Sequence, residues 1–153
     1  MAGVAARAET EGKQYRREVT KLILDSKVAR VAHSAYKLYE DCISHGSEVS
    51  AFLVFTHTGR SARVLAHFRP EVSVHAFTDQ KITMGSLCLD YGVIPHLAHT
   101  PEEGDVKHSQ ILEAVEELKR EGYVKNGESV IVLHGDTWSD EGGTSTVRLV
   151  RVP

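Results

Sequence analysis

The chain has 153 residues, of which 41% are apolar and 25% charged, and its formal net charge is -3. This length suits one domain with its own core, and the slightly acidic balance argues against nucleic-acid binding. No apolar run approaches the roughly 20 residues that span a bilayer, and residues 1–11 lack the apolar segment of a secretory signal, so we expect a cytoplasmic protein with no membrane partner.

The first part of the chain combines a leader, a helix and a strand. We expect residues 1–24 to form a partly flexible leader and residues 25–153 to form the folded domain. Asp25 or Ser26 is a suitable N-cap, and the apolar residues that follow recur at spacings of three and four, which predicts an amphipathic helix over 27–43. The apolar run 51–55 then predicts a strand that is buried on both faces.

A hydroxyl-rich turn follows this strand and leads into a short helix that ends before Pro70. Such a turn is a generic anion site, because the first N–H groups of a helix have no partner inside it. The turn 56–61 offers hydroxyl groups from Thr56, Thr58 and Ser61, and Arg60 or Arg63 adds positive charge. The simpler alternative is that Thr58 only caps the helix.

The rest of the chain alternates strands with helices, which indicates an α/β fold. Pro95 removes a ladder donor and therefore places its strand at a sheet edge, whereas the last connection lacks a helix and favours an antiparallel return. We expect a single three-layer domain with helices on both faces of a five-stranded, mostly parallel sheet in the order 3-2-1-4-5, with an antiparallel last strand. The further strands are predicted at 72–77, 93–97, 129–133 and 146–152. The further helices, with their caps included, are predicted at 78–91 and 105–121, where Thr78 or Asp79 caps the first and Asp105 caps the second.

In this strand order the winding reverses between the first and the fourth strand, and ligands bind beside such a switch point. The loop 134–146 should therefore face the turn 56–61 across one crevice. Trp138 could stack on a sugar or a base, and Gly142 and Gly143 let backbone N–H groups approach a ligand. The same loop carries acids that oppose an anion unless they point away from it or bind a cation: Asp136, Asp140 and Glu141.

The histidines do not follow a metal-binding pattern. The chain has nine of them, but none form a His-x-x-x-His pair on one helix face, and His96-x-x-His99 falls near a strand end. We therefore expect no metal site.

A hydrolytic or transfer reaction in the crevice is an alternative function. A small phosphatase or transferase would use His57 or His134 as its base and Ser61 or Thr58 as its nucleophile. Such chemistry requires the base within hydrogen-bond reach of the nucleophile, and nothing in the spacing demands that.

Five segments in order resemble one known family. Phe55-Thr56-His57-Thr58-Gly59-Arg60-Ser61-Ala62-Arg63, with Phe68-Arg69-Pro70 after it, is similar to the effector-loop region of the pyruvate kinase C-terminal domain. The other segments that resemble this domain are 72–78, 89–95, 118–132 and 143–153.

The resemblance implies a regulatory domain without catalytic residues. In that family the Thr/Ser turn holds one phosphate of a sugar bisphosphate, a role that would fall here to Thr56, His57, Thr58, Gly59 and Ser61. Residues 142–144, ending with Thr144, would approach the rest of the ligand. Catalysis, with its magnesium and potassium, belongs to a separate barrel domain of about 250 residues. The resemblance therefore implies no cofactor in this domain, and as partners a phosphorylated small molecule and either further copies of the chain or a pyruvate kinase catalytic region.

Two functions without catalysis remain open beside the regulatory one. The chain could be a stand-alone module that binds a phosphorylated ligand. It could also be an assembly module, because the fifth strand would leave an unpaired edge that can pair with a second copy across a two-fold axis.

Overall fold

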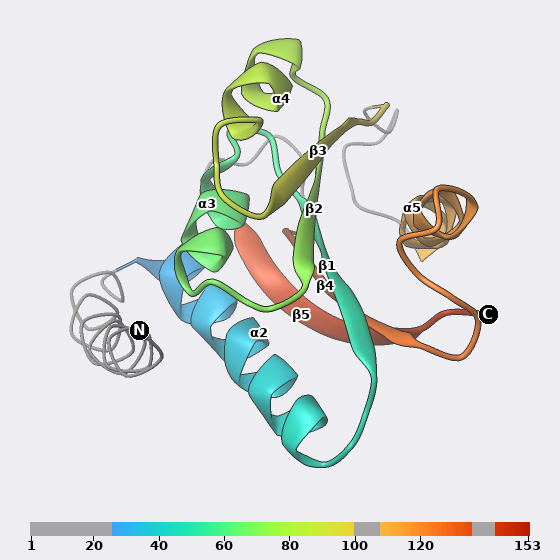
Figure 1. Cartoon of the computed structure of the whole chain (residues 1–153). Coiled ribbons are helices and arrows are strands. Elements are labelled where there is room, and N and C mark those ends of the chain that lie inside the picture. The colour runs from blue at the N-terminus through green and yellow to red at the C-terminus, as the bar shows by residue number, and fades with distance from the viewer. Residues whose placement is uncertain (1–25, 100–107, 136–142) are drawn as a thin grey trace, which may run out of the picture.

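The structure is a computed structural model that describes residues 26–99, 108–135 and 143–153. The expected leader, residues 1–24, lies outside this part of the chain. Strands and helices alternate through most of the described residues (Figure 1). The elements are α2 Lys27–Ser44, β1 Val49–Phe55, α3 Arg60–His67, β2 Ser73–Thr78, α4 Lys81–Leu87, β3 Val93–Leu97, α5 His108–Arg120, β4 Ser129–Gly135 and β5 Thr144–Arg151.

The sheet has five strands in the order β3-β2-β1-β4-β5, which confirms the predicted order. The pairs β1–β2, β1–β4 and β2–β3 are parallel, and β5 runs antiparallel to β4. Pro95 lies in the edge strand β3, as its missing N–H predicts. The winding reverses between β1 and β4, so the turn after β1 and the segment after β4 leave from the same end of the sheet.

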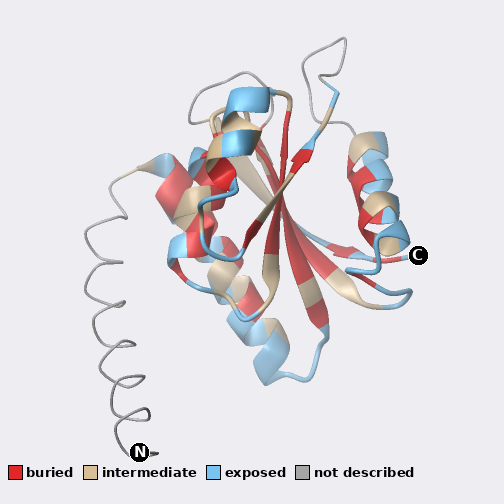
Figure 2. Ribbon diagram, turned by 45° about the horizontal axis from the view of Figure 1, so that its top comes forward, coloured by how far each residue is buried: buried red, intermediate tan, exposed pale blue. Residues whose placement is uncertain are grey.

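Helices cover both faces of the sheet, with α2 and α3 on one side and α5 on the other (Figure 1). Both faces of β1 are buried, which explains why apolar and polar residues do not alternate along it. Phe52 and Val54 pack toward α2 and α3, whereas Leu53 and Phe55 pack toward α5. The central strands are buried along most of their length (Figure 2). The sheet is therefore the middle of three layers, as predicted.

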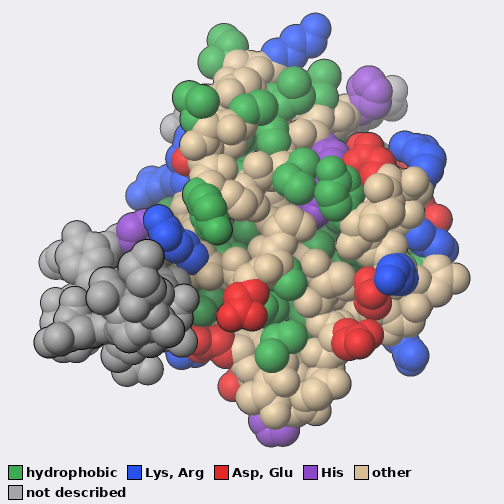
Figure 3. All heavy atoms as spheres, viewed as in Figure 1, with side chains coloured by type: hydrophobic (Ala, Val, Ile, Leu, Met, Phe, Trp, Pro, Cys, Tyr) green, Lys and Arg blue, Asp and Glu red, His purple; other side chains and the backbone are tan. Residues whose placement is uncertain are grey.

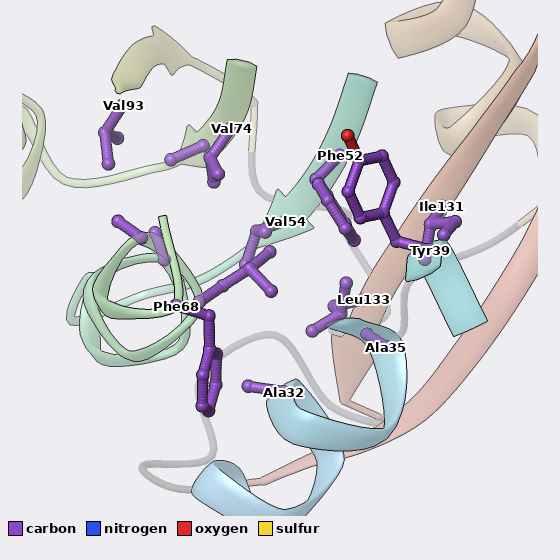
Figure 4. Packing of buried hydrophobic residues seen from close by; sticks show 14 of the residues in the cluster. Ala32, Ala35, Tyr39, Phe52, Val54, Phe68, Val74, Val93, Ile131 and Leu133 are labelled. Carbon is purple, nitrogen blue, oxygen red and sulfur yellow. The ribbon is translucent and has the colours of Figure 1, made fainter. Parts of the chain in front are cut away.

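The helix α2 lies close to the sheet because small side chains face it. Ser26 caps the helix by accepting a hydrogen bond from the Ala29 N–H at 3.2 Å. Ala32 and Ala35 are fully buried, and Tyr39 packs its ring against Phe52 at 5.4 Å between centroids (Figure 4). Larger side chains at the two alanines would push the helix away from the sheet.

The helix α4 is shorter than the predicted 78–91 segment. Thr78 is still part of β2, and its hydroxyl accepts a hydrogen bond from the Gln80 N–H at 3.2 Å, so the N-cap is Gln80 in place of the expected Thr78 or Asp79. The apolar side chains of this segment are largely exposed, Ile82 at 89% and Tyr91 at 74%. Within the described ranges no helix combines the length and the hydropathy needed to cross a membrane.

Candidate functional site

The turn between β1 and α3 is held by its own first residue. Gly59 is the N-cap of α3 with φ 79°, a left-handed conformation that suits glycine. Its N–H donates a 3.0 Å hydrogen bond to the Thr56 hydroxyl. The expectation that Thr58 caps the helix is therefore wrong, because the cap residue is Gly59 and the side chain that closes the turn is Thr56.

Gly59 also lies against α4. A Cβ atom at this position would sit 3.0 Å from Cδ2 of Leu87 and 3.1 Å from Cγ2 of Thr83. The turn thus needs glycine for two independent reasons, its backbone conformation and the close approach of α4.

Arg63 braces the turn from the first helical turn of α3. Its Nε donates to Asp90 Oδ2 at 3.0 Å, its Nη1 to the Thr58 carbonyl at 3.2 Å, and its Nη2 to the Ser86 hydroxyl at 2.6 Å. These contacts direct its charge toward the α4–β3 connection. The exposed Arg60 is therefore the better placed of the two arginines for a ligand at the turn.

His57 is fixed on the other side of the turn. Its Nδ1 lies 2.8 Å from Asp79 Oδ1, and its carbonyl accepts a hydrogen bond from the Thr83 hydroxyl at 3.0 Å. The sequence did not indicate this pairing, because the two residues are 22 positions apart and follow neighbouring strands.

The turn meets the start of β5. The Ser61 hydroxyl lies 2.5 Å from the Thr144 hydroxyl, and both side chains are buried. These residues are 83 positions apart in the sequence, and their contact brings the turn 56–61 together with the segment that precedes the last strand. Gly143, half-buried, comes directly before Thr144.

At the position of the expected crevice, these two segments present backbone donors and the exposed side chain of Arg60. The helix α3 begins at Arg60 and its Arg63 N–H donates to the Gly59 carbonyl at 3.1 Å, so the N–H groups of residues 60–62 have no carbonyl partner within the helix. They point outward at the positive end of the helix dipole. Thr58 lies half-buried beside them, with Arg60 exposed.

Two of the residues expected at the ligand lie outside the described part of the chain, Trp138 and Gly142. The acids expected to oppose an anion, Asp136, Asp140 and Glu141, lie outside it as well. The remaining expected residues, 56–61 together with Gly143 and Thr144, all belong to the two segments that meet at the Ser61–Thr144 contact.

The hydrolase alternative receives no support from these contacts. His57 bonds to Asp79, whereas Ser61 bonds to Thr144. His134 turns its Nδ1 toward the neighbouring Gly135 carbonyl at 2.9 Å. The candidate bases His57 and His134 and the candidate nucleophile Ser61 thus each bond to a different partner.

Known proteins with the same architecture are pyruvate kinases. The chain is 29% identical over 123 residues to "Pyruvate kinase" of Thermoplasma acidophilum, covering 80% of this chain and 21% of the relative. It is 27% identical over 151 residues to "Pyruvate kinase" of Lactococcus lactis, covering 97% of this chain and 28% of the relative. The chain therefore spans between a fifth and a third of these relatives.

A solved structure agrees in fold. The crystal structure of a pyruvate kinase from Cryptosporidium parvum superposes with a TM-score of 0.66 at 22% sequence identity, over 82% of this chain and 23% of that one. The family model "Pyruvate kinase, alpha/beta domain" matches residues 29–150, which run from within α2 to within β5. The chain therefore belongs to the pyruvate kinase alpha/beta domain family.

Proposed function

We propose that this domain is regulatory and binds a phosphorylated metabolite in the crevice between the turn 56–61 and the start of β5. The observation that carries the proposal is the buried contact of Ser61 with Thr144, because it joins the two halves of the crevice. The N–H groups at the start of α3 and the exposed Arg60 support an anionic ligand. The family resemblance favours a sugar bisphosphate, with residues 142–144 approaching the rest of the ligand. Trp138 is included in the proposal as a side chain that stacks on the sugar.

In this proposal the 153 residues do not catalyse phosphoryl transfer between phosphoenolpyruvate and ADP themselves. A barrel domain of about 250 residues would be required for that reaction in this family. The purified chain, supplied with phosphoenolpyruvate, ADP, magnesium and potassium, should form no pyruvate above background. Pyruvate formation by the chain alone would contradict this part of the proposal.

The binding part is tested by titrating fructose bisphosphates, nucleotides and inorganic phosphate while following Trp138 fluorescence and the melting temperature. Thr58→Asp places a carboxylate in the crevice, and like charges a few Å apart repel by about 1–4 kcal/mol near a protein surface. This variant should bind at least about tenfold more weakly. Ser47→Asp makes the same charge change at an exposed site before β1, at the other end of the strand, and should bind like the parent.

A second role, contact between subunits, is favoured by the position of β5. This strand ends the sheet, and Leu149 on it is 47% exposed. A strand at the edge of a sheet is suited to pairing with a second copy across a two-fold axis. Sedimentation velocity should show a concentration-dependent dimer that Leu149→Lys dissociates; a monomer at all concentrations would remove this role and leave ligand binding unaffected.

A further inference from the structure

A group of titratable side chains lies away from the crevice, between α5 and the edge strand β3. We call His96, Glu117 and Glu121 the His–Glu cluster. One potential ligand atom from each of these residues lies within 4.8 Å of the others. In the space-filling view, a histidine surface and an acidic surface adjoin each other on the side of α5 (Figure 3).

Local structure explains how the cluster forms. The Glu121 N–H donates to the Glu117 carbonyl at 3.0 Å, which continues the helical pattern of α5 and places the two carboxylates one turn apart on the same face. His96 comes from β3, where its ring stacks on Phe77 of the neighbouring strand at 4.6 Å between centroids and 12° between planes. The helix and the strand thus present their ligand atoms to one point.

A chain of hydrogen bonds behind His96 fixes the orientation of its ring. Its Nε2 lies 2.9 Å from Nδ1 of His75, and Nε2 of His75 lies 2.8 Å from the Ser73 hydroxyl. His75 is fully buried, and Tyr123 packs edge-on against it at 4.5 Å. His96 therefore points its other nitrogen, Nδ1, at the Glu117 carboxylate, 3.3 Å away.

Two arrangements of the same number of protons satisfy this series of hydrogen bonds. In the first, His96 donates its Nδ1–H to Glu117 and accepts at Nε2 from His75. In the second, His96 donates its Nε2–H to His75, and its Nδ1 lone pair faces the carboxylate. The second arrangement places two electron-rich atoms against each other, which is favourable only when a cation lies between them. Binding a cation thus requires a tautomer change and no loss of a proton from the buried rings.

We propose that the His–Glu cluster binds one divalent transition-metal ion of the Zn²⁺ class through His96 Nδ1 and the carboxylates of Glu117 and Glu121. Imidazole nitrogen favours such ions, which also accept carboxylate oxygens as ligands, and a further position remains for water. Ligand atoms around zinc lie about 3.3 Å apart, given bonds of about 2.0–2.2 Å. Rotation of the partly exposed glutamates would close the present spacing. This site is separate from the proposed effector site and would clamp α5 to the edge of the sheet.

The full chain is titrated with ZnCl₂ in chelator-free buffer, with competition by a chromogenic chelator to obtain the affinity. One ion should bind per chain, and Glu117→Gln and Glu121→Gln should each weaken binding by at least about tenfold. Long-range ¹H–¹⁵N spectra should show a shift of His96 Nδ1 on zinc addition, with Nε2 protonated. Magnesium at the same concentration should not compete, because imidazole favours the softer ion.

Glu113→Gln is the matched control, since Glu113 is exposed on the same helix outside the cluster, and its zinc affinity should equal that of the parent. The carboxamide substitutions are chosen because they keep the size of the side chain. Circular dichroism of each variant shows whether the fold is retained. No zinc binding, or equal affinity in all four proteins, would overturn the proposal. A fourfold or greater loss in Glu113→Gln would also overturn it, because it would place the ion elsewhere.

Discussion

The crevice at the start of α3 and the His–Glu cluster beneath α5 are both polar regions built at the margins of one apolar sheet. The crevice is made by a continuous turn, residues 56–61, that meets one distant residue, Thr144. The cluster takes its ligands from two elements, His96 from β3 and the two glutamates from α5 and its C-terminal end, and His75 of β2 lies behind His96. The turn is a local motif that can be recognised in one stretch of sequence, whereas the cluster exists only once the chain has folded. Substitutions can therefore affect one region and leave the other unchanged.

The largest effect is expected at the crevice, from Gly59→Ala. A left-handed backbone costs a non-glycine residue about 1–3 kcal/mol, and the added Cβ would meet Leu87 at 3.0 Å, where overpacking costs about 1–3 kcal/mol more. Urea unfolding should therefore show a loss of about 2–6 kcal/mol. Gly92→Ala is the control, because Gly92 has φ 73° and no atom within 4 Å of its built Cβ. Equal losses in both variants would contradict the close approach of α4 to the turn.

The second effect belongs to His75, which lies behind the cluster against His96, and it depends on pH. Burial, followed by the neighbouring His96, lowers the pKa of His75 from 6.5 to about 4. The unfolded chain therefore binds more protons than the folded one between these two values. Stability contributed by His75 is present above pH 6.5 and is lost as the pH falls toward 4, by about 3 kcal/mol in total.

The measurement is the free energy of unfolding from pH 7 to 4.5, with a chelator present to keep the protein metal-free. His75→Leu removes the titrating ring, so its stability should fall less steeply over this range. The groups facing His75, namely His96, Ser73 and the Tyr123 ring, remain in both proteins. Parallel pH profiles for parent and variant would show that His75 is not the responsible group.

The smallest effect is expected from the contact that joins the two halves of the crevice. Ser61→Ala leaves the buried Thr144 hydroxyl without this partner, which should cost about 1–3 kcal/mol. Thr144→Val should cost a similar amount, and the double variant should lose about 1 kcal/mol less than the sum. Strict additivity would mean that the two hydroxyls do not stabilise each other.

Most of the fold could be predicted from the sequence because its signals are local. The apolar run 51–55, the edge proline Pro95 and the short final connection together indicated the strand order and the antiparallel β5. The helix predicted at 78–91 was the exception. Ile82 and Tyr91 follow an apolar pattern but are exposed, so periodicity alone overestimated the length of α4.

The candidate site could be predicted only in part, because only some of its signals are local in the sequence. The turn 56–61 is contiguous and was found directly, and its meeting with Thr144 followed from the strand order. The contacts of Asp79 with His57 and of Asp90 with Arg63 were not predicted, because the partners in each pair are more than 20 residues apart in the sequence. The His–Glu cluster was missed because a search for two histidines on one helix face cannot detect a histidine on a strand opposite two glutamates on a helix.

The most direct test of the central claim, that the start of α3 binds a phosphate group, is a ¹H–¹⁵N titration of the labelled chain with inorganic phosphate and then fructose bisphosphate. The amides of Arg60, Ser61 and Ala62 should shift most, with Thr144 following, and Thr58→Asp should abolish the shifts. Absence of any shift, or shifts confined to β3 and α5, would contradict the claim.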